Sequence, residues 1–269
     1  MCGRYASARK RQDLLEEFRI DRDRVTDDLE PDYNVAPTKP VYAVLTRSRG
    51  GPGEGAGDPV DGAAAAGPAA DGAAADVARE LRVVRWGLVP FWAKDPSIGS
   101  RMINARVETV DAKPAFRRAF AKRRCLLPAD GFYEWLKVEQ AGKVHKQPYY
   151  IHRSDGGGLA FAGLYELWRD KSVPDDHPRA WLWTTVIITT SAEDEVGRIH
   201  DRMPMVVDPA RWADWLDPAS NDSAHVHALL APAAASGLAS YPVGTDVNYV
   251  RNNGPGLIEP LAGDPARLA

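Results

Sequence analysis

The chain has 269 residues, of which 44% are hydrophobic, so it can bury a substantial core and is not an intrinsically disordered protein. Its formal net charge of −3 excludes a general attraction to nucleic acid, so any such contact must come from local clusters of Lys and Arg. Only two cysteines are present, Cys2 and Cys125, which argues against a disulfide scaffold and a cysteine-rich zinc site.

The sequence also bears on where the protein works. A charged helical pattern follows the first residues without an apolar segment, so no signal peptide is expected. No apolar run approaches the roughly 18–20 residues that a membrane span requires. We therefore expect a cytoplasmic protein without a membrane partner.

The first part of the chain predicts a short helix and a long insertion. Ser7 is positioned to cap a helix that carries Leu14 and Phe18 on one face. From about residue 48 to 78 the sequence is almost entirely Gly, Ala, Pro and Asp. This composition offers little to bury, so we expect a disordered surface insertion within the domain.

A basic segment lies in the middle of the chain. A helix is expected from Pro114, with Phe116 and Phe120 along it. Six basic residues without an intervening acid accompany it: Lys113, Arg117, Arg118, Lys122, Arg123 and Arg124. Such a run is usually a solvated helix face, and the functional alternative is a patch that binds phosphates.

Short runs rich in β-branched and aromatic residues, separated by Gly, Asp and Pro, predict strands through much of the chain. Strands are expected at 41–45, 81–86, 125–127, 132–136, 149–152, 159–164, 181–190, 205–207 and 241–247, and helices at 193–199, from 209 and at 222–230. This balance predicts a single α+β domain, built on a curved antiparallel or barrel-like β-sheet with flanking helices.

Cys2 is the first candidate for chemistry. A free cysteine is most often a buried apolar residue. Met1 is expected to be removed because a small residue follows it, and Cys2 would then carry a free α-amine and a thiol on adjacent carbons. An aldehyde would form a Schiff base with the amine, and the thiol would close a five-membered thiazolidine ring.

Two further side chains are candidates for proton transfer. Glu134 lies between aromatic residues that could raise its pKa, although an exposed strand position is the more ordinary interpretation. His200 lies in a polar cluster, where Asp201 could orient its ring. Residues that could hold phosphates, sugar oxygens or bases are Arg4, Asn34, Phe91, Trp92, Asn104, Arg106 and Arg202.

Taken together, these residues form motifs that resemble those of the SRAP family, the SOS response-associated peptidases or abasic-site-processing proteins. The motifs occur in the family's order: MCGRY (1–5), YNVAPT (33–38), WGLVPFW (86–92), INARVET (103–109), GFYEW (131–135), IHDRMP (199–204) and NYVRNN (248–253). The resemblance implies one SRAP domain over residues 2–262, interrupted only by the insertion.

The resemblance also implies a function. The expected partner is single-stranded DNA that contains abasic sites, bound by a monomer without a cofactor or metal, in the cytoplasm or at the bacterial nucleoid. Cys2 would crosslink to the ring-opened aldehyde of the lesion as a thiazolidine. Lyase activity would proceed through the Schiff base, and the peptidase activity would remove Met1.

Site roles follow from the same resemblance, motif by motif. The implied catalytic residues are Cys2 as crosslinker, Asn104 as holder of the sugar and the Cys2 amine, Glu134 as acid–base group and His200 as the group that assists ring opening and crosslink reversal. The implied DNA contacts are Arg4, Arg106 and Arg202 to phosphates, and Asn34, Pro37 and Trp92 as groove and wedge residues. A further arginine expected from the family falls at Pro114 in this chain.

Two other functions remain open from the residues alone. N-terminal-nucleophile amidohydrolases also begin Met-Cys-Gly and attack amides with the thiolate, but Arg4-Tyr5 and the His-Asp-Arg cluster do not fit them. A non-catalytic single-strand DNA binder, in which Cys2 is incidental, is the third hypothesis.

Overall fold

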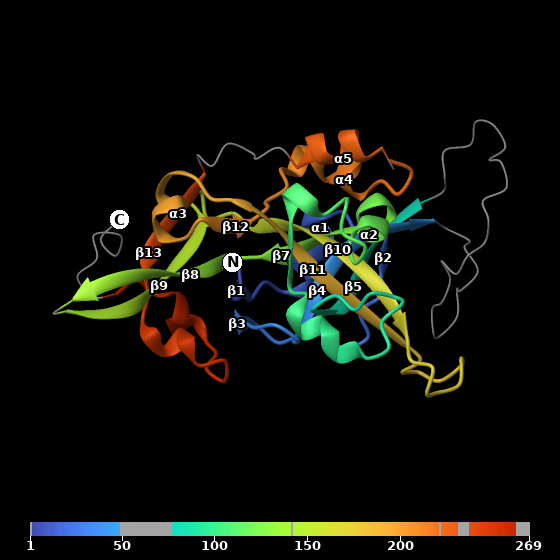
Figure 1. Ribbon diagram of the computed structural model, residues 1–269, viewed down its shortest axis with the longest axis horizontal. Helices are drawn as coiled ribbons and strands as arrows, with labels where there is room; N and C mark the ends of the chain where they lie inside the picture. Colours follow the sequence, from blue (N-terminus) through green and yellow to red (C-terminus); the bar gives the residue numbers. More distant parts are fainter. Residues whose placement is uncertain (1, 49–76, 141, 221, 231–236, 262–269) are drawn as a thin grey trace.

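The computed structural model describes residues 2–48, 77–140, 142–220, 222–230 and 237–261 (Figure 1). The predicted insertion lies, apart from its two ends, outside the described residues, as does Met1. In the part of the chain that is described, no helix is long and apolar enough to cross a membrane.

The larger of two sheets closes on itself. In sheet order its strands are β12 (Arg202–Pro204), β11 (Trp181–Ser191), β10 (Leu159–Arg169), β7 (Arg124–Ala129), β4 (Pro40–Ser48), β5 (Val77–Trp86) and β2 (Arg22–Asp23), with β6 (Asn104–Arg106) paired to β11. The strands β11, β10, β7, β4 and β5 are paired in this order, and a parallel pairing of β11 with β5 joins the first strand to the last. The result is a five-stranded barrel, which confirms the expected α+β, barrel-like architecture.

The second sheet carries the start of the chain. Its order is β13 (Leu238–Pro242), β9 (Lys143–Arg153), β8 (Gly131–Gln140), β1 (Tyr5–Ser7) and β3 (Asp32–Val35), all antiparallel. The β8–β9 hairpin extends toward one end of the molecule, whereas β1 lies near its middle (Figure 1). The first residues are therefore held inside the fold.

Side-chain alternation along the barrel strands builds two cores. Val44, Leu126 and Val186 belong to one core, while their neighbours Leu45 and Cys125 belong to the other. Because successive side chains of a strand point to opposite faces, each strand supplies both cores. The second core also receives residues of the smaller sheet, including Cys2, Tyr5 and Phe132.

The α-helices of the described residues are α1 (Arg11–Glu17), α2 (Arg117–Lys122), α3 (Asp194–Ile199), α4 (Trp212–Leu216) and α5 (Ser223–Leu229). All of these except α3 contribute buried residues to the first core, and α3 adds Val196 and Ile199 to the second. Phe18, at the end of α1, stacks on Trp212 of α4 with ring centroids 4.4 Å apart. Trp215 is completely buried and donates its indole N–H to the carbonyl of Cys125 at 2.9 Å. Burial of such side chains contributes about 1.5–3 kcal/mol each.

Some element boundaries differ from the sequence prediction. Ser7 lies in β1 and does not cap α1, which is preceded by Lys10 without a side-chain cap. The strand predicted at 205–207 is wrong, since β12 comes earlier and only Val206 forms an isolated bridge, to Phe161. The final strand also ends earlier than predicted, and a 3-10 helix (Thr245–Asn248) follows it.

Candidate active site

Strand pairing fixes the position of Cys2. Tyr5 pairs with Phe132, and the carbonyl of Arg4 accepts a hydrogen bond from the backbone N–H of Tyr133 at 3.0 Å. Since β1 and β8 are antiparallel, the residues before Tyr5 run beside those after Tyr133. The Tyr5 ring anchors this end of the chain by edge contacts with Trp86 and Phe161, at centroid distances of 5.4 and 5.8 Å.

The thiol of Cys2 is completely buried. Its Sγ lies 3.8 Å from the carbonyl oxygen of Arg4 as a weak donor. Burial raises the pKa of the Cys2 thiol well above its ordinary value, and the negative charge of Glu134 raises it further. The thiol therefore stays protonated at neutral pH, and its use as a nucleophile requires a nearby base.

Asn104 is held against Cys2. Its strand β6 pairs in parallel with β11, with Asn104 opposite Ile187. The indole N–H of Trp86 donates to the carbonyl of Ile103 at 2.9 Å, which fixes the residue before it. The Asn104 Nδ2 donates to the Cys2 carbonyl at 2.7 Å, and within the described residues its buried Oδ1 has no hydrogen-bond partner. That oxygen can accept a hydrogen bond from a donor group of a bound molecule.

Glu134 is buried near the Cys2 thiol. Only 3% of the residue is exposed, and burial raises the pKa of its carboxyl group, while an electrostatic interaction with His200 partly opposes that rise. A carboxyl group with a raised pKa can hold and release a proton closer to neutral pH than an exposed one. The burial of Glu134 agrees with the raised pKa expected from the sequence and differs from the alternative of an exposed strand position.

His200 follows the end of α3, and its backbone N–H donates to the carbonyl of Val196 at 3.0 Å. Its ring Nδ1 accepts the backbone N–H of Arg202 at 2.9 Å, and a carboxylate oxygen of Asp201 lies equally far from the same nitrogen. A backbone N–H can only donate, so it favours the neutral tautomer with the proton on Nε2. The Asp201 side chain is 86% exposed and holds the ring only weakly.

Glu134 and His200 line one cavity of about 580 Å³. Its other lining residues, none of them among the sequence-predicted site residues, are Trp135, Lys137, Lys146 and Asn248. Trp135 donates its indole N–H to Asn248 Oδ1 at 2.7 Å, which joins β8 to the NYVRNN motif. The aromatic Trp135 and the position of Asn248 in a motif were the available sequence signals, whereas the two lysines carried none.

The three predicted arginine contacts differ in their surroundings. Arg4 donates to Asn34 Oδ1 at 2.6 Å and to the Val247 carbonyl at 2.7 Å. Arg202 is nearly buried and pairs with the carboxylate of Glu108, whose pKa it lowers. Arg106 is exposed, and no ion pair or hydrogen bond of its side chain is found within the described chain. Only Arg106 offers its guanidinium to a ligand without exchanging an internal partner.

The predicted groove and wedge residues also differ. Trp92 is 51% exposed and Pro37 is partly exposed, so both are accessible to a ligand. Asn34 is completely buried, and its Nδ2 donates to the carbonyls of Val247, Tyr249 and Asn252. Asn34 thus holds a loop in place and presents no surface to DNA in this structure.

The basic run of the sequence divides into surface and core residues. Arg117 and Arg118 are exposed on α2, and Arg118 lies over the ring of Phe91, 4.6 Å from its centroid. Arg123 forms a buried ion pair with Glu166. Arg124 is also buried and donates to the carbonyls of Phe120, Ala121, Trp215, Asp217 and Ser220.

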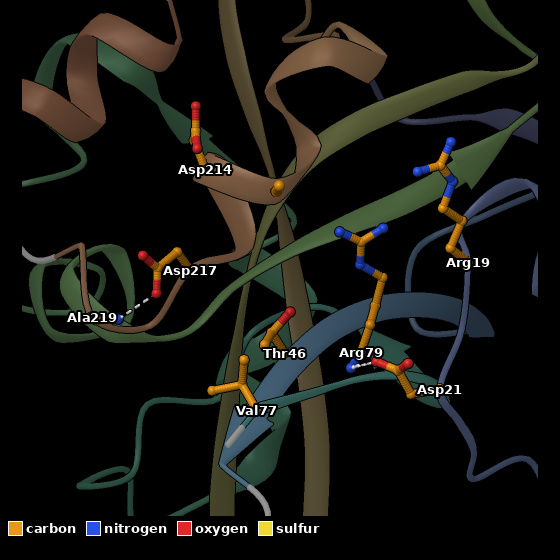
Figure 2. A pocket seen from close by; sticks show the side chains of 9 residues that line it. Arg19, Asp21, Thr46, Val77, Arg79, Asp214, Asp217 and Ala219 are labelled. Carbon is orange, nitrogen blue, oxygen red and sulfur yellow. Dashed lines mark hydrogen bonds between the residues drawn. The ribbon is translucent and has the colours of Figure 1, made fainter. Parts of the chain in front are cut away.

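A second cavity, of about 620 Å³, lies away from Cys2 (Figure 2). Its lining includes positively and negatively charged side chains, among them Arg19, Arg79 and Asp214, but none of the predicted site residues. Figure 2 shows that its carboxylates serve the backbone: Asp21 accepts the N–H of Arg79 at 2.8 Å and Asp217 that of Ala219 at 2.9 Å. Among the described residues, no group of His, Cys, Asp and Glu side chains is arranged to hold a metal ion.

Comparison with known proteins gives this arrangement its context. Abasic site processing protein YoqW of Bacillus subtilis (strain 168) is 36% identical over 259 residues, covering 96% of this chain and 99% of that protein. Abasic site processing protein HMCES of Gallus gallus is 34% identical over 206 residues, covering 68% of this chain and 58% of that protein.

Fold similarity extends to a solved structure of a protein from Bacteroides thetaiotaomicron. It superimposes with a TM-score of 0.72 at 25% identity, covering 97% of this chain and all of that one. The family model described as SOS response associated peptidase (SRAP) matches residues 1–250. The chain therefore belongs to the SRAP family.

Proposed function

We propose that this protein processes abasic sites in single-stranded DNA by forming a covalent crosslink through Cys2. The observation that carries the proposal is the convergence of Cys2, Asn104 and Glu134, from three separate segments, with His200 on the cavity that Glu134 lines. The names of the relatives, abasic site processing proteins, support the same substrate.

The chemistry uses both functional groups of Cys2 once Met1 has been removed. The α-amine attacks the aldehyde carbon of the ring-opened abasic sugar, and loss of water gives a Schiff base. The thiol then adds to the imine carbon, its proton passing to the nitrogen. The product is a thiazolidine, and one water has been released overall. Because the second step is intramolecular, it gains a large effective concentration.

The buried thiol needs help in this step, and Glu134 is the group that supplies it. Its carboxylate accepts the proton of the thiol and its carboxylic acid form donates to the leaving hydroxyl during dehydration. Asn104 fixes Cys2 through its carbonyl, and its unpartnered Oδ1 accepts a hydrogen bond from the amine or the sugar. His200 assists ring opening of the sugar and, in reverse, release of the crosslink.

The same intermediate accounts for two accompanying activities. A Schiff base acidifies the neighbouring C–H of the sugar, so proton removal and departure of the 3′ phosphate would cleave the strand as a lyase. Peptide-bond hydrolysis between Met1 and Cys2, which frees the α-amine, is the peptidase reaction of the proposal. Arg106 and Trp92, which are exposed, are the contacts for a phosphate and a base.

A gel assay tests the proposal. Single-stranded DNA with one uracil is incubated with the protein, with and without uracil-DNA glycosylase. A heat-stable shifted band is expected only after glycosylase treatment and only when Cys2 is intact, with Cys2→Ala as control. Absence of the band from a protein verified to begin at Cys2 would overturn the proposal. Glutamine hydrolysis would instead favour an amidohydrolase, and Cys2-independent binding of intact DNA a non-catalytic binder.

A further inference from the structure

Two lysines face each other on the β8–β9 hairpin. Lys137 of β8 is the direct register partner of Lys146 of β9, and both are exposed. Side chains at directly opposite positions of an antiparallel pair lie close together on one face, where like charges destabilise the pairing. The hairpin therefore carries a local repulsion that a bound anion would relieve.

Within the described residues, the lysine pair has no internal anionic partner. In the described part of the chain, neither ammonium group has an ion-pair or hydrogen-bond partner. The next residue on the same face of β8 is Glu139, which is opposite Val144 and forms no ion pair with either lysine within 4 Å. The two positive charges are left to solvent or to a ligand.

The lysines also border the candidate active site. Lys137 and Lys146 line the cavity of about 580 Å³ that Glu134 and His200 line as well. Glu134 is the one carboxylate among the lining residues, and its burial favours the protonated form, which limits its repulsion of an anion. An anionic group bound between the lysines would thus share one cavity with Glu134 and His200.

We propose that Lys137 and Lys146 together bind one backbone phosphate of the DNA strand, close to the reacting nucleotide, so that the strand leaves the site over the β8–β9 hairpin. The assignment rests on the proposed function, which makes a single strand the substrate. A phosphate diester carries one negative charge and oxygen acceptors for two ammonium donors, which matches a pair of lysines at directly opposite positions. Trp135, whose indole N–H is held by Asn248, lines the same cavity as the two lysines.

The test measures how binding of intact single-stranded DNA depends on salt. Full-length Lys137→Gln, Lys146→Gln and the double variant are compared with Lys143→Gln, a lysine on β9 that does not line the cavity. One lost phosphate contact on a single strand lowers the slope of log K against log salt by about 0.7, which is about fivefold weaker binding at 0.1 M salt. We expect this loss in the double variant and none in Lys143→Gln.

Thermal unfolding separates lost binding from lost folding. Because the substitutions remove a repulsion, the melting temperature of the double variant should equal or exceed that of the wild type. A slope equal to that of the wild type, or the same loss in Lys143→Gln, would overturn the assignment. A lowered melting temperature together with weaker binding would also contradict it, since that result is expected of lysines with a structural role.

A neutral methylphosphonate at a single position locates the phosphate. The methylphosphonate is moved one linkage at a time away from the abasic site, and the affinity of wild type and double variant is measured at each position. By the logic of a double-mutant cycle, the two proteins should bind equally well only when the neutral linkage is the one that the lysines contact, at one or two positions. Equal differences at every linkage would overturn the assignment. The crosslinking gel of the wild type is read separately: slopes that change without crosslinking refute the proposed function alone, whereas crosslinking with unchanged slopes refutes the lysine pair alone.

Discussion

The carboxyl group of Glu134 and the thiol of Cys2 are both buried and interact electrostatically, and burial raises the pKa of both. Each therefore favours its uncharged form, although the chemistry needs a proton to leave the thiol. Both groups can be uncharged at rest and the thiol can still react if Glu134 accepts the proton of the thiol once the substrate is bound. A buried carboxyl group is thus kept at the expense of stability, as is common at catalytic positions.

Glu134→Gln tests this trade-off. A carboxyl group with a raised folded-state pKa binds its proton more tightly in the native than in the unfolded protein. Wild-type stability should therefore fall as pH rises from the usual glutamate pKa through the raised value, and this decline should be absent in the variant. Urea unfolding between pH 4 and 8 measures it. Crosslinking should slow at least about tenfold with DNA affinity retained; equal loss of both would indicate a structural role.

Arg106 and Arg124 contrast an exposed arginine with a buried one. Arg106→Gln should weaken single-strand binding and lower its salt slope by about 0.7, with little change in stability, because within the described chain its exposed side chain forms no ion pair or hydrogen bond. Arg124→Met should cost about 2–4 kcal/mol of stability, because it leaves buried carbonyls without donors. The salt dependence of DNA binding and the free energy of urea unfolding are measured for both variants. Destabilisation by Arg106→Gln would contradict the assignment.

At the scale of elements, one buried side chain makes several of the hydrogen bonds that hold the 247–252 segment in place. Asn34 on β3 bonds three carbonyls of this segment and also accepts from Arg4. The N-terminal strand and the NYVRNN motif are thereby tied together beside the cavity that Asn248 lines. The role of Asn34 in this structure is to position that segment.

Asn34→Ala should lower the free energy of unfolding by about 2–4 kcal/mol, since the buried carbonyls lose their donor. Partly exposed Asn252 is the matched control, because its Nδ2 makes one hydrogen bond, to the Asp246 carbonyl, and Asn252→Ala should cost less than about 1 kcal/mol. Urea unfolding compares the two, and amide exchange should rise at residues 247–252 only in Asn34→Ala. Equal costs would exclude the anchoring role.

Sequence patterns predicted most strands of this fold but could not give their partners. Alternating or apolar runs such as 159–164 and 181–190 fall within β10 and β11, because their side chains fill two cores. The segment 205–207 is equally apolar, yet the strand that pairs with β11 is formed by residues 202–204. Likewise, the buried Arg202 forms an ion pair with the exposed Glu108, which lies 94 residues earlier in the chain, so sequence analysis could not find the pair.

At the scale of the whole molecule, one parallel pairing closes the barrel. The contact of β11 with β5 joins residues about 100 positions apart, Thr184 to Arg85 and Thr185 to Trp86. The composition predicted a barrel-like sheet, but a long-range parallel pairing of this kind has no local sequence signal. The closure matters for the site, because the strands it joins carry Trp86 and the pairing partner of Asn104.

The register of β4 and β5 predicts that the insertion between them is dispensable for folding. Ser48 and Val77 are paired across this ladder, so an Asn-Gly turn in place of residues 49–76 can join them as a hairpin. Each halving of loop length gains about 0.6 kcal/mol, so the shortened protein should be slightly more stable. Thermal unfolding and the crosslinking gel measure the outcome; loss of the fold or of crosslinking would contradict it.

The central claim is that Cys2 reacts through both its amine and its thiol. The most direct measurement is mass spectrometry of the crosslinked N-terminal peptide after nuclease digestion and treatment with a thiol-alkylating reagent. The account predicts an adduct on Cys2 that forms without borohydride, has the mass of the sugar remnant less one water, and carries no alkyl group on sulfur. An adduct that requires borohydride, lies on a lysine, or leaves the Cys2 sulfur open to alkylation would contradict it.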